Sequence, residues 1–293
     1  MRQRAVTEFK MKTLVLDQLI NFAIEEDAVH RDITTNILIA KQQILKAFII
    51  VKSPAVLCGI DIAGRIYKKL DRTIRFSSAY RDGDRVKANT RIVTIQGKTN
   101  VILRGERIAL NFLSYLSAIA TKTSEYVRAV RPYKTTILDT RKTTPGLRFL
   151  ERMAVRCGGG RNHRNNLAQM VLIKDNHRHA CAKMLSLYDL IQKVKRSAQD
   201  RIEVEVNNLT EFKDALRAGP DIILLDNMNL KMIRNAMKIY NNIKLSRKPL
   251  LEASGGITLD HVRRIAQTGI HRISIGDLTH SRKSIDMSLE VMK

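Results

Sequence analysis

Six short apolar runs in the second half of the chain constrain its fold most. They are TTILD, MVLIK, IEVEV, DIILLD, LLEAS and RISIG, ending at or near Asp139, Lys174, Glu205, Asp226, Ser254 and Gly276. Each run has the length of a buried strand, and helical patterns separate most of them, for instance over 209–218, 230–240 and 259–267. Strands and helices that alternate at this spacing form parallel pairs through right-handed crossovers. The pattern predicts an α/β fold containing a (β/α) barrel, whose chemistry lies at the carboxyl ends of its strands.

The whole chain is predicted to form two domains, of which the barrel is the second. Only six strands are clear, so we expect an incomplete TIM-like barrel over 116–293, with an open doubly wound sheet as the alternative. Residues 1–115 combine a helical pattern near 14–23 with short β-branched runs between turns, which predicts a smaller α/β domain. C-terminal residues could return to that domain. A broad helical pattern over 105–130 connects the two.

Charge and cysteine content narrow the class of protein. The chain has 52 Lys and Arg against 28 Asp and Glu, a net charge of +24, and nine of the basic residues lie within 139–178 against three acidic ones. Compositional drift or general solubility is favoured over a polyanion partner as the source of the overall excess, although the sequence does not give the reason for it. No zinc-finger spacing or aromatic RNA-binding pattern indicates specific nucleic-acid binding. Three widely spaced cysteines build neither a disulfide framework nor a CxxC metal pair.

Membrane and secretion signals are also lacking in the sequence. No apolar run approaches the length of a bilayer span, and Glu8 and Asp17 interrupt the apolar core that a secretion signal needs. We therefore expect a cytoplasmic enzyme without a membrane partner.

Basic side chains at the predicted strand ends form a first candidate site. Arg141 and Lys142 follow the first strand, His163 and Arg164 lie beyond a run of glycines, and Lys174 ends the second strand. A charge-assisted hydrogen bond from Arg or Lys contributes about 1.5–3 kcal/mol. Several such bonds converging on one face of a barrel could hold a small substrate with more than one carboxylate.

Acidic residues and glycines supply the remaining candidates. Glu205 and Asp226, at the ends of consecutive strands, could bind ribose hydroxyls or a divalent cation that keeps some of its waters. Glu203 points to the same face as Glu205, and pairing of either carboxylate with a barrel lysine is the alternative. The glycines of SGG (254–256) and IGD (275–277) follow the last two strands, where barrels commonly bind phosphate.

These residues lie in segments that resemble one family. The block DTRKTTPGLRFLERMAVRCGGGRNHRNNLAQMVLIKDNH (139–177), together with GERIALNFLSYLSAIAT, IEVEV, ILLDN, EASGGI and ISIGDLTHS, resembles the quinolinate phosphoribosyltransferases, the carboxylating nicotinate-nucleotide pyrophosphorylases. The resemblance runs from about residue 26 to the C-terminus. It implies an N-terminal α/β sandwich domain, an incomplete barrel and a homodimer.

The resemblance also implies a reaction and a set of roles. The activity would be that of a glycosyltransferase of the pentosyltransferase class: quinolinate and phosphoribosyl pyrophosphate would give nicotinate mononucleotide, pyrophosphate and CO₂, with Mg²⁺, in NAD biosynthesis. Quinolinate would contact Arg141, His163, Arg164, Lys174 and, from the other subunit, Arg107. Phosphoribosyl pyrophosphate would contact Lys142, Glu205, Asp226, Ser254, Gly255, Gly256 and Gly276, and the metal would bind Glu205 and Asp226, directly or through water. Lys142, Glu205 and Asp226 would be the catalytic residues.

Four positions depart from the family pattern, and two other functions remain open. Arg31, Ala118 and Asn166 stand where the family has glycine, and Gln169 stands where it has aspartate. None of the four has an assigned role, although Arg31 would be strained if its position required positive φ. The alternatives are a paralogue of the same fold associated with molybdate transport and a catalytically inactive, basic polyanion-binding protein. The quinolinate enzyme is favoured over the paralogue because the chain keeps all five predicted quinolinate-binding residues: Arg107, Arg141, His163, Arg164 and Lys174. A polyanion binder is disfavoured because it would have no use for the carboxylates of Glu205 and Asp226 in its cleft.

Overall fold

The computed structural model describes residues 2–181, 185–281 and 283–292, with side chains from residue 14 onward. The chain divides into two compact units. The first comprises Met1–Thr121, Phe149–Gly158 and Arg282–Lys293, and the second comprises Lys122–Arg148 and Gly159–Ser281. Helix α4 (Thr99–Ala129) begins in the first unit and ends in the second, and it starts before the predicted residue 105.

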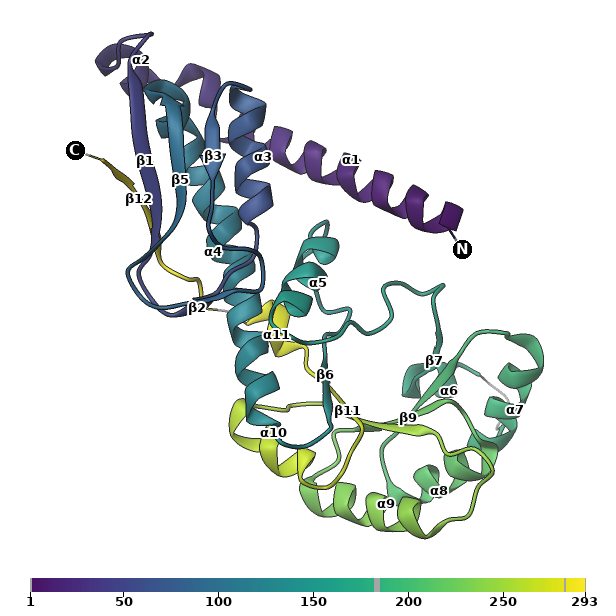
Figure 1. The fold of residues 1–293 in the computed structure, drawn as a ribbon. Coiled ribbons are helices and arrows are strands. Elements are labelled where there is room, and N and C mark those ends of the chain that lie inside the picture. The colour runs from purple at the N-terminus through teal and green to yellow at the C-terminus, as the bar shows by residue number, and fades with distance from the viewer. Residues whose placement is uncertain (1, 182–184, 282, 293) are drawn as a thin grey trace. The chain divides into compact units, whose positions relative to one another are not determined.

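The first unit is built on an antiparallel sheet of four strands in the order β12-β1-β5-β3 (Figure 1). Its strands are β1 (Ile44–Val51), β3 (Arg75–Ser77), β5 (Thr90–Lys98) and β12 (Met287–Val291), and β2 (Ala55–Val56) pairs with β4 (Arg85–Val86). Alternate residues of β1, namely Ala47, Ile49 and Val51, are buried, as expected for a strand with one face on a core. The unit also contains α1 (Arg2–Glu26), a 3-10 turn (Val29–Arg31), α2 (Ile33–Leu38), α3 (Ile60–Leu70) and nearly all of α5 (Arg148–Cys157).

The C-terminal strand belongs to this first unit, although it follows the whole of the second unit in sequence. β12 pairs antiparallel with β1, with Ile49 opposite Leu289, and the Lys52 amide donates to the carbonyl of Asp286. The first unit therefore contains both ends of the chain that the structure describes.

The second unit contains six parallel strands in the order β6-β11-β10-β9-β8-β7. They are β6 (Thr136–Leu138), β7 (Val171–Ile173), β8 (Ile202–Val206), β9 (Ile222–Asp226), β10 (Leu250–Ser254) and β11 (Arg272–Ser274). The helices are α6 (Asp175–Ala180), α7 (Leu187–Ser197), α8 (Leu209–Ala218), α9 (Leu230–Asn242), α10 (Leu259–Ala266) and α11 (Asp277–His280). Figure 1 shows α8, α9 and α10 on one side of the strands.

The strand order decides between the two predicted folds. From β7 to β11 every strand neighbours the next in sequence, and the first strand, β6, pairs with the last, β11. A doubly wound sheet reverses direction at a switch point, whereas this order is cyclic and is interrupted only between β6 and β7. The prediction of an α/β fold with an incomplete barrel is confirmed, and the doubly wound alternative is wrong. Among the described residues, no helix is long and apolar enough to span a membrane.

Capping groups explain why the barrel helices begin where they do. The Asn208 side chain accepts hydrogen bonds from the amides of Thr210 and Glu211, and Asn229 accepts from Met232. Such caps satisfy backbone donors that a helix leaves unpaired in its first turn. The loops that follow β8 and β9 are also short, spanning 207–208 and 227–229.

Candidate active site

A cavity of about 870 Å³ opens at the carboxyl ends of the six parallel strands. Every predicted site residue except Arg107 lines it: Arg141, Lys142, His163, Arg164, Lys174, Glu205, Asp226, Ser254, Gly255, Gly256 and Gly276. Parallel strands end on the same edge, so residues far apart in sequence meet there. Arg107 is exposed on α4 in the first unit.

Two arginines form a cationic part of the pocket. Burial, followed by the charge of Arg141, lowers the pKa of Arg164, so the two guanidinium groups lie close enough to repel each other. Arg164 Nη1 donates to the carbonyl of Met170 at 3.0 Å. The buried Nε of Arg141 has no hydrogen-bond partner among the described residues. The pair is suited to an anionic ligand, because a bound anion would supply both the missing acceptor and the missing negative charge.

His163 is fixed at three points. Its amide donates to Asp139 Oδ1 at 2.6 Å, its Nδ1 accepts the Arg164 amide at 2.8 Å, and its Nε2 lies 3.0 Å from Glu203 Oε2 and 3.4 Å from Glu252 Oε1. Burial alone would lower the pKa of His163, but the two glutamates raise it to about 9. The Arg164 amide opposes a proton on Nδ1, because a nitrogen that accepts a hydrogen bond holds none. In either protonation state, Nε2 carries a proton toward the glutamates.

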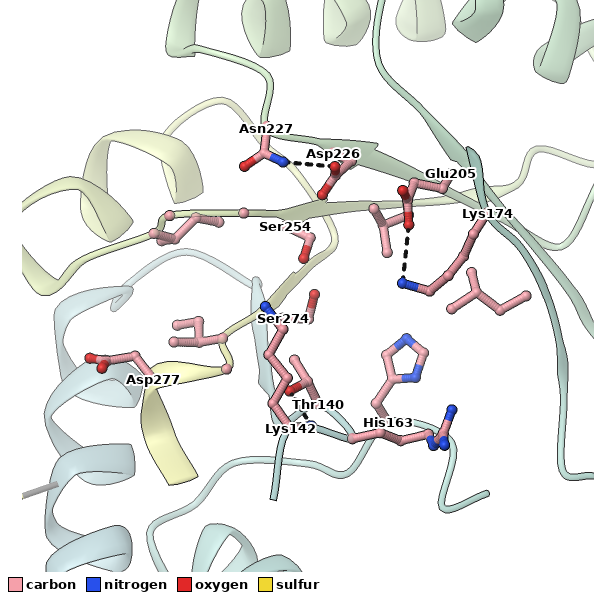
Figure 2. Close-up of a pocket in the computed structure, with 18 of the residues that line it drawn as sticks. Thr140, Lys142, His163, Lys174, Glu205, Asp226, Asn227, Ser254, Ser274 and Asp277 are labelled. Carbon is pink, nitrogen blue, oxygen red and sulfur yellow. Dashed lines mark hydrogen bonds and ion pairs between the residues drawn. The ribbon is translucent and has the colours of Figure 1, made fainter. Parts of the chain in front are cut away.

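Glu205 and Asp226 lie on the opposite side of the pocket from His163 and Lys142 (Figure 2). Glu205 Oε2 is 3.5 Å from Lys174 Nζ. Burial raises the pKa of Glu205, Lys174 lowers it, and the charge of Asp226 raises it again. Of the two glutamates on β8, Glu205 is therefore the one that contacts a lysine, whereas Glu203 contacts His163.

The chemistry of Glu205 and Asp226 suits a hard divalent cation. The two carboxylates act on each other electrostatically, and Lys174 is the only cation recorded in contact with either one among the described residues. A divalent ion would relieve the repulsion between them, and it could keep waters on its remaining coordination positions. The pair thus offers oxygen ligands of the kind that Mg²⁺ binds.

Several residues that line the pocket or hold its lining residues in place were not singled out from the sequence. Asn227 donates from Nδ2 to Asp226 Oδ2 at 2.7 Å, and Asp139, which is fully buried, also accepts from Asn162 Nδ2 at 2.6 Å. Thr279 Oγ1 donates to the carbonyl of Lys142 at 2.6 Å. The sequence held an indication for two of them, because Asp139 ends the first apolar run and Asn227 stands directly after Asp226.

Three of the family departures lie in described loops without backbone strain. Arg31 belongs to the 3-10 turn and does not have positive φ, whereas nearby Ala28 does, at 47°. Asn166 Oδ1 accepts the amide of Ala168 at 3.0 Å, and Gln169 Oε1 accepts the amide of Asn165 at 2.5 Å. The side chains of Asn166 and Gln169 therefore each support their loop with a hydrogen bond to a nearby backbone amide.

Gly255 is expected to tolerate no side chain. Its φ is +95°, and a Cβ there would meet the Asn227 side chain and come within 3.0 Å of the Asn227 backbone nitrogen. Gly255→Ala should lower the free energy of unfolding by roughly 2 kcal/mol or more, because backbone strain alone costs on the order of 1–3 kcal/mol. Denaturant unfolding measures this.

Gly256→Ala is the matched control for that measurement. Its φ is also positive, at +57°, but no heavy atom lies within 4 Å of the added Cβ. The loss of stability should therefore be smaller than for Gly255→Ala. Equal losses for the two variants would show that the contact with Asn227 is unimportant.

Comparisons with known proteins match this architecture along nearly the whole chain. The model of the quinolinate phosphoribosyl transferase N-terminal domain matches residues 32–117, and that of the C-terminal domain matches residues 119–290. The chain is 38% identical over 284 residues to a probable carboxylating nicotinate-nucleotide pyrophosphorylase of Bacillus subtilis, covering 96% of this chain and 95% of the relative. It is 36% identical over 278 residues to the carboxylating nicotinate-nucleotide pyrophosphorylase of Mycobacterium leprae, covering 93% and 95%.

A solved structure agrees with the sequence relatives. The nicotinate-nucleotide pyrophosphorylase of Francisella tularensis superposes with a TM-score of 0.87 at 38% identity, covering 95% of this chain and 96% of that one. Both family domains are therefore present in order, and relatives well above 30% identity span the same length. The chain belongs to the quinolinate phosphoribosyltransferase family.

Proposed function

We propose that this chain transfers the phosphoribosyl group of phosphoribosyl pyrophosphate to the nitrogen of quinolinate and promotes loss of one carboxylate, giving nicotinate mononucleotide, pyrophosphate and CO₂. One observation carries the proposal: a single pocket combines paired guanidinium groups with a carboxylate pair. The first suits a dicarboxylate and the second suits the ribose and metal of a phosphorylated sugar. A pocket that served only to bind polyanions would gain nothing from Glu205 and Asp226.

Quinolinate is held, in this proposal, by the cationic part of the pocket. Arg141, whose Nε lacks a partner among the described residues, takes one carboxylate together with Arg164. Lys174 lines the same pocket and lies 3.5 Å from Glu205 Oε2, so in this proposal it exchanges Glu205 for the second carboxylate. His163 lines the pocket beside Arg164, whose amide donates to its Nδ1.

Phosphoribosyl pyrophosphate occupies the remaining side. Ser254, Gly255, Gly256 and Gly276 surround its 5′-phosphate, where missing side chains let backbone amides approach closely. Lys142 faces the pyrophosphate, and Glu205 and Asp226 lie near the ribose. Mg²⁺ bound by Glu205 and Asp226, in part through water, would supply charge neutralisation for the leaving pyrophosphate.

The chemistry then needs little beyond orientation and charge. As the bond to pyrophosphate breaks, positive charge develops on the ribose, and Glu205 and Asp226 stabilise it electrostatically. Attack by the pyridine nitrogen makes a cationic ring. When the neighbouring carboxylate leaves as CO₂, its bonding electron pair stays on the ring carbon, stabilised by the adjacent positive nitrogen, and a proton from water then takes the place of the carboxylate. The chain's part in that step is to hold the carboxylate in position in a partly dry site. No residue forms a covalent bond to the substrate in this scheme.

A homodimer is part of the proposal. Arg107 is exposed in the first unit, and it would reach quinolinate in the pocket of a second copy, as the family resemblance implies. Cytoplasmic action, in NAD biosynthesis, accords with the three free cysteines.

The test is an assay of the purified protein with quinolinate, phosphoribosyl pyrophosphate and Mg²⁺. We expect nicotinate mononucleotide and CO₂ in equal amounts, none of either without Mg²⁺, and a sedimenting species of twice the 33.4 kDa chain. Product without CO₂ would overturn the proposed decarboxylation. A folded protein that forms no product would favour the paralogue associated with molybdate transport.

A further inference from the structure

A buried ionic layer lies directly beneath the pocket residues of three strands. Glu205, Ser254 and Ser274 line the cavity at the ends of β8, β10 and β11. Side chains two residues apart on a strand point to the same face, so Glu203, Glu252 and Arg272 occupy the layer below. Both glutamates have no exposed surface, and Arg272 Nε lies 2.8 Å from Glu252 Oε2.

A layer of charged side chains is unusual in the interior of a barrel. Barrel interiors are usually filled by branched apolar side chains, and buried charges carry a large desolvation penalty. Arg272 balances one of the two carboxylates. The other faces His163 Nε2, so the histidine connects this buried layer to the pocket above it.

His163 links the two buried glutamates to Arg164 through its ring. Both ring nitrogens of His163 are engaged by protein groups: Nε2 by the two glutamates and Nδ1 by the Arg164 amide. Asp139 holds the His163 amide, and Met170 holds the Arg164 guanidinium through its carbonyl. The backbone and the side chain of Arg164 are thus each fixed by one hydrogen bond.

We propose that Glu203 and Glu252 are positioning residues that act through the ring of His163 to hold Arg164 in place for a carboxylate of the substrate. In this role His163 is a bridge between the acid layer and Arg164, since neither of its ring nitrogens is left to face the ligand. The inference rests on the proposed function, because quinolinate is the dicarboxylate used as the probe. Arg272 supplies the positive charge that a metal ion between these groups would otherwise provide.

A double-mutant cycle tests the proposed coupling. Glu203→Gln keeps the shape of the side chain and removes its charge, so it should raise the KM for quinolinate by about tenfold, within the range of energies that couple contacting residues. The KM for phosphoribosyl pyrophosphate should change by less than about twofold, since that substrate is bound elsewhere in the pocket. Combining it with Arg164→Ala should cost no more than Arg164→Ala alone.

Further variants keep the test decisive if Glu203→Gln folds poorly. His163→Gln removes the acceptor for the Arg164 amide and should show the same non-additivity with Arg164→Ala. Glu151→Gln is the matched control, because Glu151 is equally buried but lies in the first unit and accepts from Tyr115. It should leave the KM for quinolinate unchanged.

Two outcomes would overturn the inference. Additive losses in the Glu203→Gln/Arg164→Ala pair would mean that Glu203 acts independently of Arg164, and equal rises in both KM values would mean that the layer only supports the barrel. Failure of the proposed function is distinguishable from either one, because the unmodified protein would then neither bind quinolinate nor form product.

Discussion

Arg141→Ala is expected to reduce kcat/KM for quinolinate by roughly two to four orders of magnitude. A charge-assisted hydrogen bond contributes about 1.5–3 kcal/mol, and one guanidinium can donate two such bonds to the same carboxylate. The structure places this arginine at the pocket with a buried Nε that has no partner among the described residues. The truncation therefore removes donors that are free to bind substrate, and it breaks no recorded ion pair. Steady-state kinetics with varied quinolinate measures the loss.

Arg141→Lys separates charge from geometry. Lysine keeps the positive charge but not the planar pair of donors, so its activity should fall between that of Arg141→Ala and the unmodified protein. Arg247→Ala is the matched control, because Arg247 has a largely exposed side chain and pairs with Asp221 before the start of β9. It should leave kcat/KM unchanged. Full activity of Arg141→Lys would contradict bidentate recognition.

The elements of the barrel could be predicted because each has a local signal. The pattern over 209–218 became α8 with the same bounds, since an apolar stripe and an asparagine cap both specify it. The residues of the pocket followed from the same pattern, because the carboxyl ends of parallel strands must meet. Identifying strand ends was therefore enough to bring together residues as distant as Arg141 and Gly276.

The order of the strands and the contacts between distant side chains could not be predicted from the sequence. The cyclic strand order depends on β6 pairing with β11, and nothing local to Thr136 or Arg272 specifies that partner. Glu203 illustrates the same limit at the level of side chains. Periodicity placed it on the inner face of β8, but whether it met a lysine or a histidine depended on a loop forty residues earlier in the chain.

Asp226→Asn is expected to lower kcat by roughly 100-fold or more, because charge stabilisation by a bound metal is worth several kcal/mol in the transition state. The substitution preserves the size of the side chain, and it removes one of the two carboxylates that repel each other across the proposed Mg²⁺ site. The concentration of Mg²⁺ that gives half-maximal rate should rise, whereas quinolinate binding in the absence of Mg²⁺ should be unchanged, since the guanidinium groups remain.

Asp221→Asn provides the matched control for this variant, because it makes the same chemical change just before the other end of the same strand. Asp221 accepts the amide of Ile202 and pairs with Arg247, away from the residues that line the cavity. We expect Asp221→Asn to reduce the free energy of unfolding modestly and to leave the Mg²⁺ dependence of the rate unaltered. If both variants shifted the Mg²⁺ dependence equally, the effect would come from the strand as a whole and the assignment of Asp226 to the metal would be wrong. A shift confined to Asp226→Asn would instead tie the metal to the pocket end of β9, where the charge of Asp226 already raises the pKa of Glu205.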